Sequence, residues 1–333
     1  MVVDRDEINA IEELKSALDP RPDVITFRVE ADHIVDLYCY ISKDKKIPES
    51  ITGLKYLKRI QVTNIPIERP GPFPEPVVKL HSLEEFTGGL FTRVPKSIAN
   101  LRNLTLLNLG IRCQIPATIG ELSKLRKIRL GYDYLAKIPE GLLSCMNLQE
   151  LNLSQNKIDL FPADIAKLKN LQVLDLSHNE ITAVPPEIGE LKMLRNLRLN
   201  NNKITSLPSE ICTLGNLGIF DLSNNVLTSF PSESPITMSS LEWLDLTGNR
   251  LGDDVDFTPF TSVEHLRLGG NAFTRLPRLP APPGVASLRF LDIDGNPGLK
   301  VTKAELKEVV KAYSNLQIYY TGARGFTEAV VSP

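Results

Sequence analysis

The sequence has no long apolar run, no excess of either charge and no paired cysteines. No stretch of about 18 or more apolar residues occurs, so no segment is predicted to span a bilayer. The formal net charge is −2, which gives no electrostatic reason to expect nucleic acid or an anionic membrane as a partner. The N-terminal segment is acidic and amphipathic, unlike a signal peptide. With 42% hydrophobic and 23% charged residues, the chain is expected to be folded rather than disordered.

The cysteines are scattered along the chain. Cys39, Cys113, Cys145 and Cys212 form no CxxC motif and do not cluster at either end. Such spacing is typical of reduced, buried thiols in a reducing compartment. The sequence therefore predicts a cytoplasmic protein.

What the sequence does contain is one repeating unit. The segment NLQVLDLSHNEITAVPP (170–186) recurs as NLQELNLSQNKIDLFP, 23 residues earlier, and as MLRNLRLNNNKITSLP, 23 residues later. On the template LxxLxLxxNxL, each xLxL is predicted to be a short strand, with leucines pointing inward and the alternating residues outward. Units are 21 to 26 residues apart and begin at Ile34, Leu57, Leu83, Leu104, Leu125, Leu148, Leu171, Leu194, Leu217, Leu241, Val263 and Leu288.

Two further positions of the unit carry structural information. A buried asparagine can donate to and accept from the turning backbone, so successive template asparagines predict a supporting ladder. They are Asn156, Asn179, Asn202, Asn225, Asn249, Asn271 and Asn296, and since earlier repeats lack them, the N-terminal half is predicted to be less regular. Prolines are predicted to begin a short helical return segment at positions 48, 95, 116, 139, 162, 185 and 208.

The predicted organisation is one structural domain with closed ends, which favours a complete protein. Residues 1–33 form an N-terminal cap, a helix followed by the first strand of a hairpin. Residues 34–300 form about twelve repeats, with an insertion near 64–80. Residues 301–320 form a C-terminal cap helix and strand, and residues 321–333 a loose tail.

Capping boxes are predicted at both terminal helices. Asp4 and Glu7 fit a variant of the motif at the first helix, and Thr302 and Glu305 fit it at the second. The apolar face of the first helix is predicted to comprise Ile8, Ile11, Leu14 and Leu18.

The combined pattern LPxxIxxLxxLxxLxLxxNxI appears in LFPADIAKLKNLQVLDLSHNEI and again in VPPEIGELKMLRNLRLNNNKI. It resembles the intracellular leucine-rich-repeat proteins of the 23-residue, Ras-suppressor-like type and their plant relatives, over residues 34–300. The resemblance implies an α/β repeat fold: a right-handed, horseshoe-shaped leucine-rich-repeat solenoid, with a parallel concave sheet, short helical or 3₁₀ segments on the convex side and a cap at each end. It also implies a protein that binds other proteins on its concave face, often as a signalling adaptor or regulator.

Catalytic signatures are missing. There is no GxxxxGK[ST], no strand-linked GxGxxG, no HExxH and no GxSxG. His178 and His265 lie in repeats about 19 Å apart by the strand spacing, too far to share a metal. The sequence predicts no enzyme, no metal site and no cofactor.

The outward residues of the strands are the candidate binding residues. Large apolar groups are not needed there for the core, yet Ile219, Trp243 and Phe290 cluster in the last complete units. They either bind a partner or pack on one another as sheet neighbours, and we favour binding. Four outward aspartates, at 175, 221, 245 and 292, are interpreted as structural pairing or partner contacts because arginines share their column. The predicted partner-binding residues are Val173, Arg198, Ile219, Trp243, His265, Arg267 and Phe290.

A second candidate patch and two proline-rich segments are weaker. The patch comprises Arg59, Lys127, Arg129, Tyr132 and Tyr134, for which ordinary surface residues are an equal alternative. The segment ERPGPFPEP (68–76) is predicted to project as an extended loop, and RLPRLPAPPG (275–284) contains PxxP spacings; both are interpreted as loops at the edge of the solenoid rather than SH3 ligands.

The leading functional hypothesis is a non-enzymatic cytoplasmic scaffold or regulatory adaptor that holds a protein partner on its concave face. We expect a monomer, with no nucleic-acid partner and no membrane span. The alternative is a receptor-like or secreted ligand-binding protein, which glycans at the Asn103 sequon would favour and the unpaired cysteines oppose.

Overall fold

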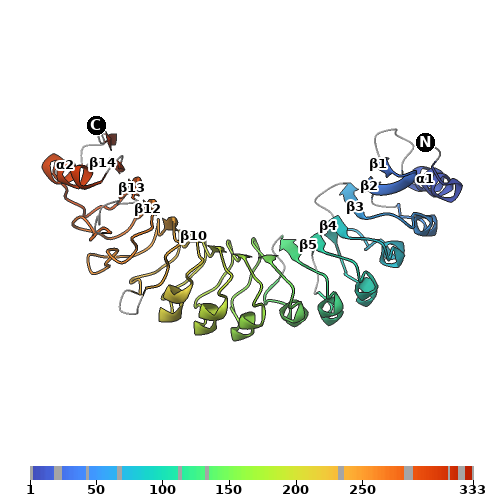
Figure 1. The fold of residues 1–333 in the computed structure, drawn as a ribbon, viewed down its shortest axis with the longest axis horizontal. Coiled ribbons are helices and arrows are strands. Elements are labelled where there is room, and N and C mark those ends of the chain that lie inside the picture. Colours follow the sequence, from blue (N-terminus) through green and yellow to red (C-terminus); the bar gives the residue numbers. More distant parts are fainter. Residues whose placement is uncertain are drawn as a thin grey trace. The chain divides into compact units, whose positions relative to one another are not determined.

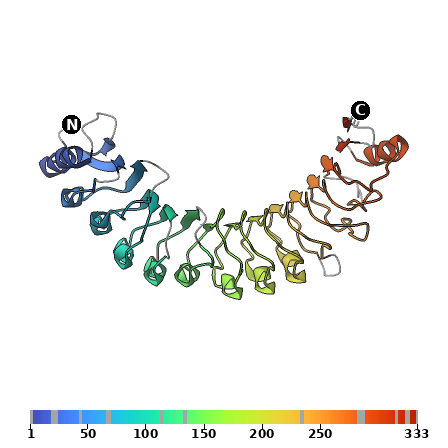
Figure 2. The ribbon, with the colours of Figure 1, turned by 180° about the vertical axis from the view of Figure 1, so that it is seen from behind.

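The computed structural model describes residues 3–18, 25–42, 45–65, 70–111, 115–131, 135–231, 236–280, 288–313, 316–321 and 327–331. The chain divides into two compact units, Met1–Lys157 and Ile158–Pro333, and each is described by itself. In each unit the strands lie along one side and the 3₁₀ helices along the other (Figure 1). Figure 2 shows the same arrangement from behind. The single structural domain expected from the sequence stays a prediction.

The first unit opens with a helix and continues as a sheet whose strands follow chain order. Its elements are α1 (Arg5–Leu18), β1 (Ile25–Glu30), β2 (His33–Ser42), β3 (Arg59–Ile65), β4 (Glu85–Phe91), β5 (Leu106–Ile111), β6 (Lys127–Gly131) and β7 (Glu150–Asn152). β1 pairs with β2 antiparallel, and the strands from β2 to β7 pair in parallel. The return segments are η2 (Glu49–Gly53), η3 (Glu75–Lys79), η4 (Lys96–Asn100), η5 (Ala117–Glu121) and η6 (Glu140–Ser144).

The second unit repeats this plan with shorter strands. Its strands are β8 (Val173–Asp175), β9 (Asn196–Arg198), β10 (Ile219–Asp221), β11 (Trp243–Asp245), β12 (His265–Arg267), β13 (Phe290–Asp292), β14 (Gln317–Thr321) and β15 (Thr327–Val331). Pairing is parallel from β8 to β14, and β15 is antiparallel to β14. Its helices are η7 (Ala163–Lys167), η8 (Pro186–Glu190), η9 (Ser209–Thr213) and α2 (Lys303–Ala312).

Proline begins each predicted return segment. All seven prolines stand directly before a 3₁₀ helix, with φ between −77° and −60°. Pro162 illustrates the geometry, because its carbonyl accepts the N–H of Ile165 at 3.1 Å and Ile165 is fully buried. The fixed φ of proline therefore sets the helix entry, and the three-residue step turns an apolar side chain to the core. The prediction is confirmed.

The asparagine ladder is also confirmed. Asn202 is typical: its Oδ1 accepts the N–H of Ile181 at 3.0 Å, and its Nδ2 donates to the carbonyls of Leu176 and Leu199, each at 2.9 Å. Each amide thus joins its own turn to the turn of the preceding repeat. Because these groups are buried, the bonds replace water that cannot reach them.

The residue before each template asparagine has a left-handed backbone, which turns the chain out of the strand. These residues are Gln155, His178, Asn201, Asn224, Gly248, Gly270 and Gly295, with φ between 54° and 68°. Strands that precede this turn have three residues, from β7 to β13, whereas β2 to β6 have five to ten. Without the asparagine turn the ladder continues further, so the N-terminal half is less regular, as predicted.

The core of each unit lies between its strands and its return segments. In the second unit, the central strand residues point inward and are almost completely buried: Leu174, Leu197, Phe220, Leu244, Leu266 and Leu291. Isoleucines of the 3₁₀ helices, Ile165, Ile188 and Ile211, are buried opposite them. The alternating strand residues are consequently left for the outer face of the sheet.

Ile11, Leu14 and Leu18 of the N-terminal helix are buried as predicted, but the helix differs from its prediction at Ile8 and Glu7. Ile8 is 42% exposed, while Glu7 is buried and its Oε2 accepts the N–H of Ile34, the second residue of β2, at 2.9 Å. Asp4 Oδ1 accepts the N–H of Asp6 instead. The predicted capping box with Glu7 is therefore wrong, because that carboxylate joins α1 to the sheet. At α2, by contrast, the predicted capping box of Thr302 and Glu305 is confirmed.

Two other segments differ from expectation. Of the segment 68–76 predicted to project, residues 68 and 69 lie outside the described residues, and the described part does not project. Gly71 bridges to Phe91, and Phe73 is buried against the rings of Phe86 and Phe91, at 5.5 Å and 5.3 Å. Burial of an aromatic ring outweighs the tendency of the prolines to leave the fold. In the predicted loose tail, residues Thr327–Val331 form β15 against β14.

Candidate functional site

The outward side chains of β8 to β13 form two parallel columns, which we call the strand face of the second unit. The first column reads Val173, Asn196, Ile219, Trp243, His265 and Phe290 in continuous register. The second column, two residues further along each strand, reads Asp175, Arg198, Asp221, Asp245, Arg267 and Asp292. All seven predicted partner-binding residues lie in these columns, so the repeat period correctly predicted their register.

Four of these residues pack into one group, the aromatic cluster: Trp243, His265, Arg267 and Phe290. The Trp243 and His265 rings stack with centroids 4.9 Å apart, and His265 and Phe290 lie 6.0 Å apart. The Arg267 guanidinium carbon lies 4.6 Å from the Trp243 centroid and 5.6 Å from that of Phe290. Stacking of this kind holds the side chains in place while leaving them half-exposed. The sheet-neighbour packing considered from the sequence is therefore present.

The other three predicted residues lie on the same face outside this cluster. Ile219 is 38% exposed and is the register partner of Trp243. Val173 is separated from Ile219 by the strand that carries Asn196. Arg198 is exposed, with Nη1 3.9 Å from Asp175 Oδ2.

The aspartates of the second column have a structural task that the sequence reasoning missed. Asp221 Oδ1 accepts the N–H of Ser223 at 3.0 Å and its hydroxyl at 2.8 Å, and Asp175 makes the same pair of bonds to Ser177. Asn152 in the first unit does likewise with Ser154. A recurring Asp-Leu-Ser or Asn-Leu-Ser was the available signal, because such side chains cap the backbone two residues on.

Burial shifts the titration of two of these carboxylates. The pKa of Asp221 is raised because burial disfavours its charge, and hydrogen bonds from Ser223 oppose that rise. The pKa of Asp292 is raised by burial as well, against the hydrogen bond from the N–H of Asp294. Ionisation of Asp221 and of Asp292 in the folded state therefore costs free energy. Arg267 offsets part of the column's charge, with Nη1 3.7 Å from Asp245 Oδ2.

The second candidate patch is not brought together. Arg59 in β3 donates two hydrogen bonds to the buried carboxylate of Asp36, at 2.7 Å and 3.0 Å. Lys127 and Arg129 in β6 both pair with Glu150. Two strands separate these groups, and every base of the patch is neutralised by a neighbouring acid. Tyr132 and Tyr134 lie outside the described residues.

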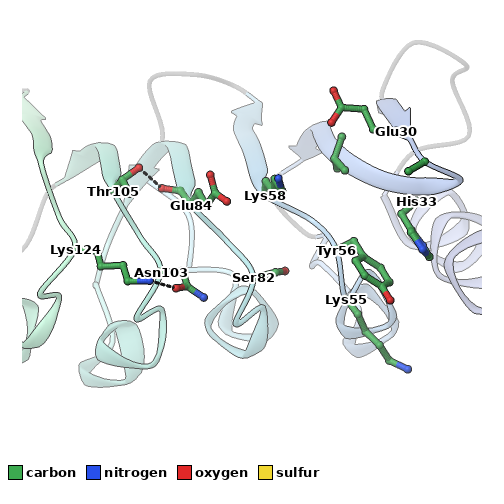
Figure 3. A pocket seen from close by; sticks show the side chains of 12 residues that line it. Glu30, His33, Lys55, Tyr56, Lys58, Ser82, Glu84, Asn103, Thr105 and Lys124 are labelled. Carbon is green, nitrogen blue, oxygen red and sulfur yellow. Dashed lines mark hydrogen bonds between the residues drawn. The ribbon is translucent and has the colours of Figure 1, made fainter.

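The first unit also has a groove that the sequence did not predict, with a volume of about 650 Å³. Figure 3 shows its wall, which runs past the starts of successive strands. His33 and Tyr56 stack at one end with centroids 3.7 Å apart. At the other end, Lys124 Nζ donates to Asn103 Oδ1 at 2.7 Å. Polar groups of this wall are thus partly engaged with one another.

Within the described ranges, no group of three or more His, Cys, Asp or Glu side chains is placed to hold a metal ion. No described helix is both long enough and apolar enough to cross a membrane.

Comparison with protein families matches the central repeats. Residues 123–181 and 192–251 match the family described as leucine rich repeat, and residues 169–210 match a two-copy description of the same repeat. The fold is a leucine-rich-repeat solenoid. The predicted fold class is therefore confirmed, in the parallel strands and 3₁₀ return segments of both units. Among curated proteins, none matches the sequence.

Solved structures with the same solenoid come from bacteria and plants. An internalin of Listeria monocytogenes is 19% identical, with a TM-score of 0.67, over 95% of this chain and 88% of that one. A leucine-rich-repeat protein of Leptospira interrogans is 23% identical, with a TM-score of 0.54, over 85% and 89% of the two chains. The ectodomain of the Arabidopsis receptor kinase HAESA, bound to a peptide hormone, is 21% identical, with a TM-score of 0.68. That match covers 94% of this chain and 61% of the ectodomain, and at such identities the likeness concerns the fold alone.

Proposed function

We propose that the chain is a non-enzymatic scaffold or regulatory adaptor that holds a protein partner on the strand face of its second unit. The aromatic cluster is the observation that carries this proposal. Its rings lie on the outer face of the sheet and do not pack into the core of the solenoid. The Arg267 guanidinium stacks over the Trp243 ring. Stacked aromatic and arginine side chains at half exposure are typical of the centre of a protein interface. Solenoids in general bind through such extended faces.

Three polar atoms that have no hydrogen-bond partner among the described residues also lie at this face. Among the described residues of the second unit, three buried side-chain atoms have no hydrogen-bond partner: Asn196 Oδ1, Thr247 Oγ1 and Arg267 Nε. Asn196 lies in β9, Arg267 lies in β12, and Thr247 lies two residues after the end of β11. Buried polar atoms are normally paired, so each of the three costs free energy in the free chain, and a side-chain rotation on binding would be needed to relieve that cost.

The test is affinity capture from native lysate with the full chain and with a Trp243→Ala/Phe290→Ala variant. Circular dichroism first establishes that the variant is folded. We expect one or a few proteins to be captured by the wild type and lost with the variant, because truncation removes the centre of the interface.

A matched control removes two exposed apolar side chains of the same unit that lie outside the columns, Leu160→Ala/Met193→Ala. This variant should capture the same proteins as the wild type. An unchanged set with the Trp243→Ala/Phe290→Ala variant would show that the aromatic cluster is only structural.

The proposal includes a cytoplasmic location and the 23-residue, Ras-suppressor-like intracellular type. Three described cysteines, Cys39, Cys145 and Cys212, are buried and unpaired. Burial raises the pKa of Cys39 to about 12 and that of Cys145 and Cys212 to about 11. Buried thiols without disulfides are common where the compartment is reducing.

The alternative is a receptor-like ligand-binding protein, which the likeness to the HAESA ectodomain favours. Glycosylation distinguishes the cytoplasmic scaffold from the receptor-like protein. At the first sequon, Asn103 Nδ2 donates to the His81 carbonyl at 2.8 Å, so the acceptor nitrogen is engaged. The chain isolated from its native cells is expected to carry no glycan at Asn103, as measured by intact mass before and after glycosidase treatment. A glycan there would support the alternative.

A further inference from the structure

The charged column of the second unit places two aspartates side by side. Four residues follow one another in register from β9 to β12: Arg198, Asp221, Asp245 and Arg267. Arg198 pairs away from Asp221, with Asp175. Arg267 pairs with Asp245. Asp221 Oδ1 accepts hydrogen bonds from the N–H and the hydroxyl of Ser223. Within the described part of the chain, Asp221 makes no ion pair.

This arrangement leaves negative charge uncompensated. The column contains four aspartates and two arginines, so its formal charge is 2 − 4 = −2. Burial raises the pKa of Asp221 and the charge of Asp245 raises it further, while hydrogen bonds from Ser223 and the charge of Arg198 oppose part of the rise. The exposed Glu242, directly before β11, adds to the field. A cation lying over Asp221 and Asp245 would remove this repulsion, since neighbouring strands are about 4.8 Å apart.

Apolar surface adjoins the two carboxylates. Ile219 and Trp243 are register partners, two residues before Asp221 and Asp245 on the same strands. We call these four residues the Asp–Trp patch. Arg267 lies over the Trp243 ring and repels a second cation on that side, which directs a cation toward Asp221.

We propose that the Asp–Trp patch binds a basic segment of the partner protein, in which a lysine or arginine and an apolar side chain are two positions apart in an extended strand. The inference rests on the proposed function, because it assigns the partner chemistry of the same face. Two residues of an extended chain span about 6.6 Å, which is the separation between the apolar and acidic ends of the patch. The basic side chain lies over Asp221 and Asp245, and the apolar one covers Ile219 and Trp243.

Polar atoms at the margins of the patch suit an extended segment. Asn196 Oδ1, in register beside Ile219, and Thr247 Oγ1, two residues after Asp245, are two of the buried acceptors that have no partner among the described residues. An extended segment presents free backbone N–H groups, which reach these covered oxygens only if the Asn196 and Thr247 side chains rotate on binding. An acidic or phosphorylated segment would instead meet the uncompensated carboxylates.

The experiment selects a displayed library of random nine-residue peptides against the full-length chain. The selected peptides are then measured by calorimetry with wild type, Asp221→Asn, Asp245→Asn and Trp243→Ala/Phe290→Ala. The asparagine variants keep the turn, because Asn152 makes the same bonds to Ser154 that Asp221 makes to Ser223. The matched control is Glu210→Gln, which neutralises an exposed acid in η9 on the opposite side of the unit.

The expected consensus is a lysine or arginine two positions from an apolar residue. Affinity should fall about tenfold or more with Asp221→Asn and with Asp245→Asn, and should be unchanged with Glu210→Gln. Raising the salt concentration from about 0.05 M to about 0.5 M should weaken binding to the wild type and have less effect on Asp221→Asn.

The first of the following results separates this inference from the proposed function, and the other two count against both. Peptides that need Trp243 and Phe290 but show no basic consensus, or that ignore both aspartates, overturn this inference and leave the proposed function standing. Peptides that bind the Trp243→Ala/Phe290→Ala variant as tightly as the wild type overturn both. A selection that enriches nothing above that variant also counts against both.

Discussion

At the scale of single residues, the template asparagines stabilise the second unit more than their size suggests. Asn202 makes one hydrogen bond as acceptor and at least two as donor with buried backbone groups. Asn202→Ala is expected to lower the free energy of unfolding by about 2–4 kcal/mol, because it leaves several of these groups unsatisfied. Urea denaturation followed by circular dichroism measures the change.

An exposed amide provides the comparison. Asn216 donates a single hydrogen bond, to the Lys192 carbonyl, at the surface. Asn216→Ala should cost about 1 kcal/mol or less. Equal losses for the two variants would show that the ladder contributes no more than an ordinary surface hydrogen bond.

Two glycines of the second unit differ in what they permit. Gly248 has φ +68°, and a Cβ there would lie 2.5 Å from Asn224 Oδ1, whereas a Cβ at Gly252 would meet nothing within 4 Å. Gly248→Ala is expected to lower the thermal midpoint, because it combines a left-handed backbone with a clash. Gly252→Ala should leave the midpoint unchanged or raise it. Differential scanning calorimetry on both variants checks the pair, and similar midpoints would contradict the assigned strain.

At the scale of elements, the aspartate column predicts a pH-dependent decrease in the free energy of unfolding. The folded-state pKa of Asp221 lies above its unfolded value near 3.8, so its ionised form destabilises the fold at neutral pH. Asp221→Asn should therefore be more stable than the wild type at pH 7. The difference should shrink as pH falls through the raised pKa, because the native carboxyl becomes protonated there. Urea midpoints measured from pH 7 to about pH 4 test this.

The pKa of Asp36, in β2, is shifted in the opposite direction to that of Asp221. Burial alone would raise its pKa, but hydrogen bonds from Arg59 and Arg28 outweigh burial and lower it. Stability from this carboxylate is present above its unfolded pKa and is lost as pH falls through the lowered value. Asp36→Asn should therefore destabilise the chain at pH 7. If both variants moved stability in the same direction, the assigned environments would be wrong.

Much of the repeat could be read from the sequence because each feature is local. The proline fixes φ, the asparagine needs a turn, and the leucine spacing fixes which side chains share a column. The predicted register of Trp243, His265 and Phe290 follows from that spacing alone. What failed depended on distant contacts: Glu7 bonds a strand residue 27 positions away, and Phe73 is buried by rings of another repeat.

The candidate site was predictable in composition but not in geometry. Columns of outward residues follow from the period, whereas the stacking of Arg267 over Trp243 depends on side-chain rotamers, which no periodicity determines. From the sequence, Asp221 is assigned to structural pairing or partner contact, because opposite charges share its column. Arg198 pairs with Asp175, so that among the described residues Asp221 has no ion pair, and this arrangement is visible only in the structure.

At the scale of the whole molecule, the predicted single body can be tested with the chain's one tryptophan. Trp243 lies in the second unit, so its fluorescence reports on that unit, while far-ultraviolet circular dichroism reports on the entire chain. One cooperative body requires the two urea transitions to coincide. Separate midpoints would show that the units Met1–Lys157 and Ile158–Pro333 unfold independently.

The three buried thiols have a use that follows from their positions. Cys39 lies in β2, Cys145 directly after η6 and Cys212 in η9, so two mark the first unit and one the second. Because burial keeps each thiol protonated and covered, an alkylating reagent can modify it only when its own surroundings open. Timed alkylation followed by peptide mass spectrometry would therefore record the order in which the repeats open, with no label added to the chain.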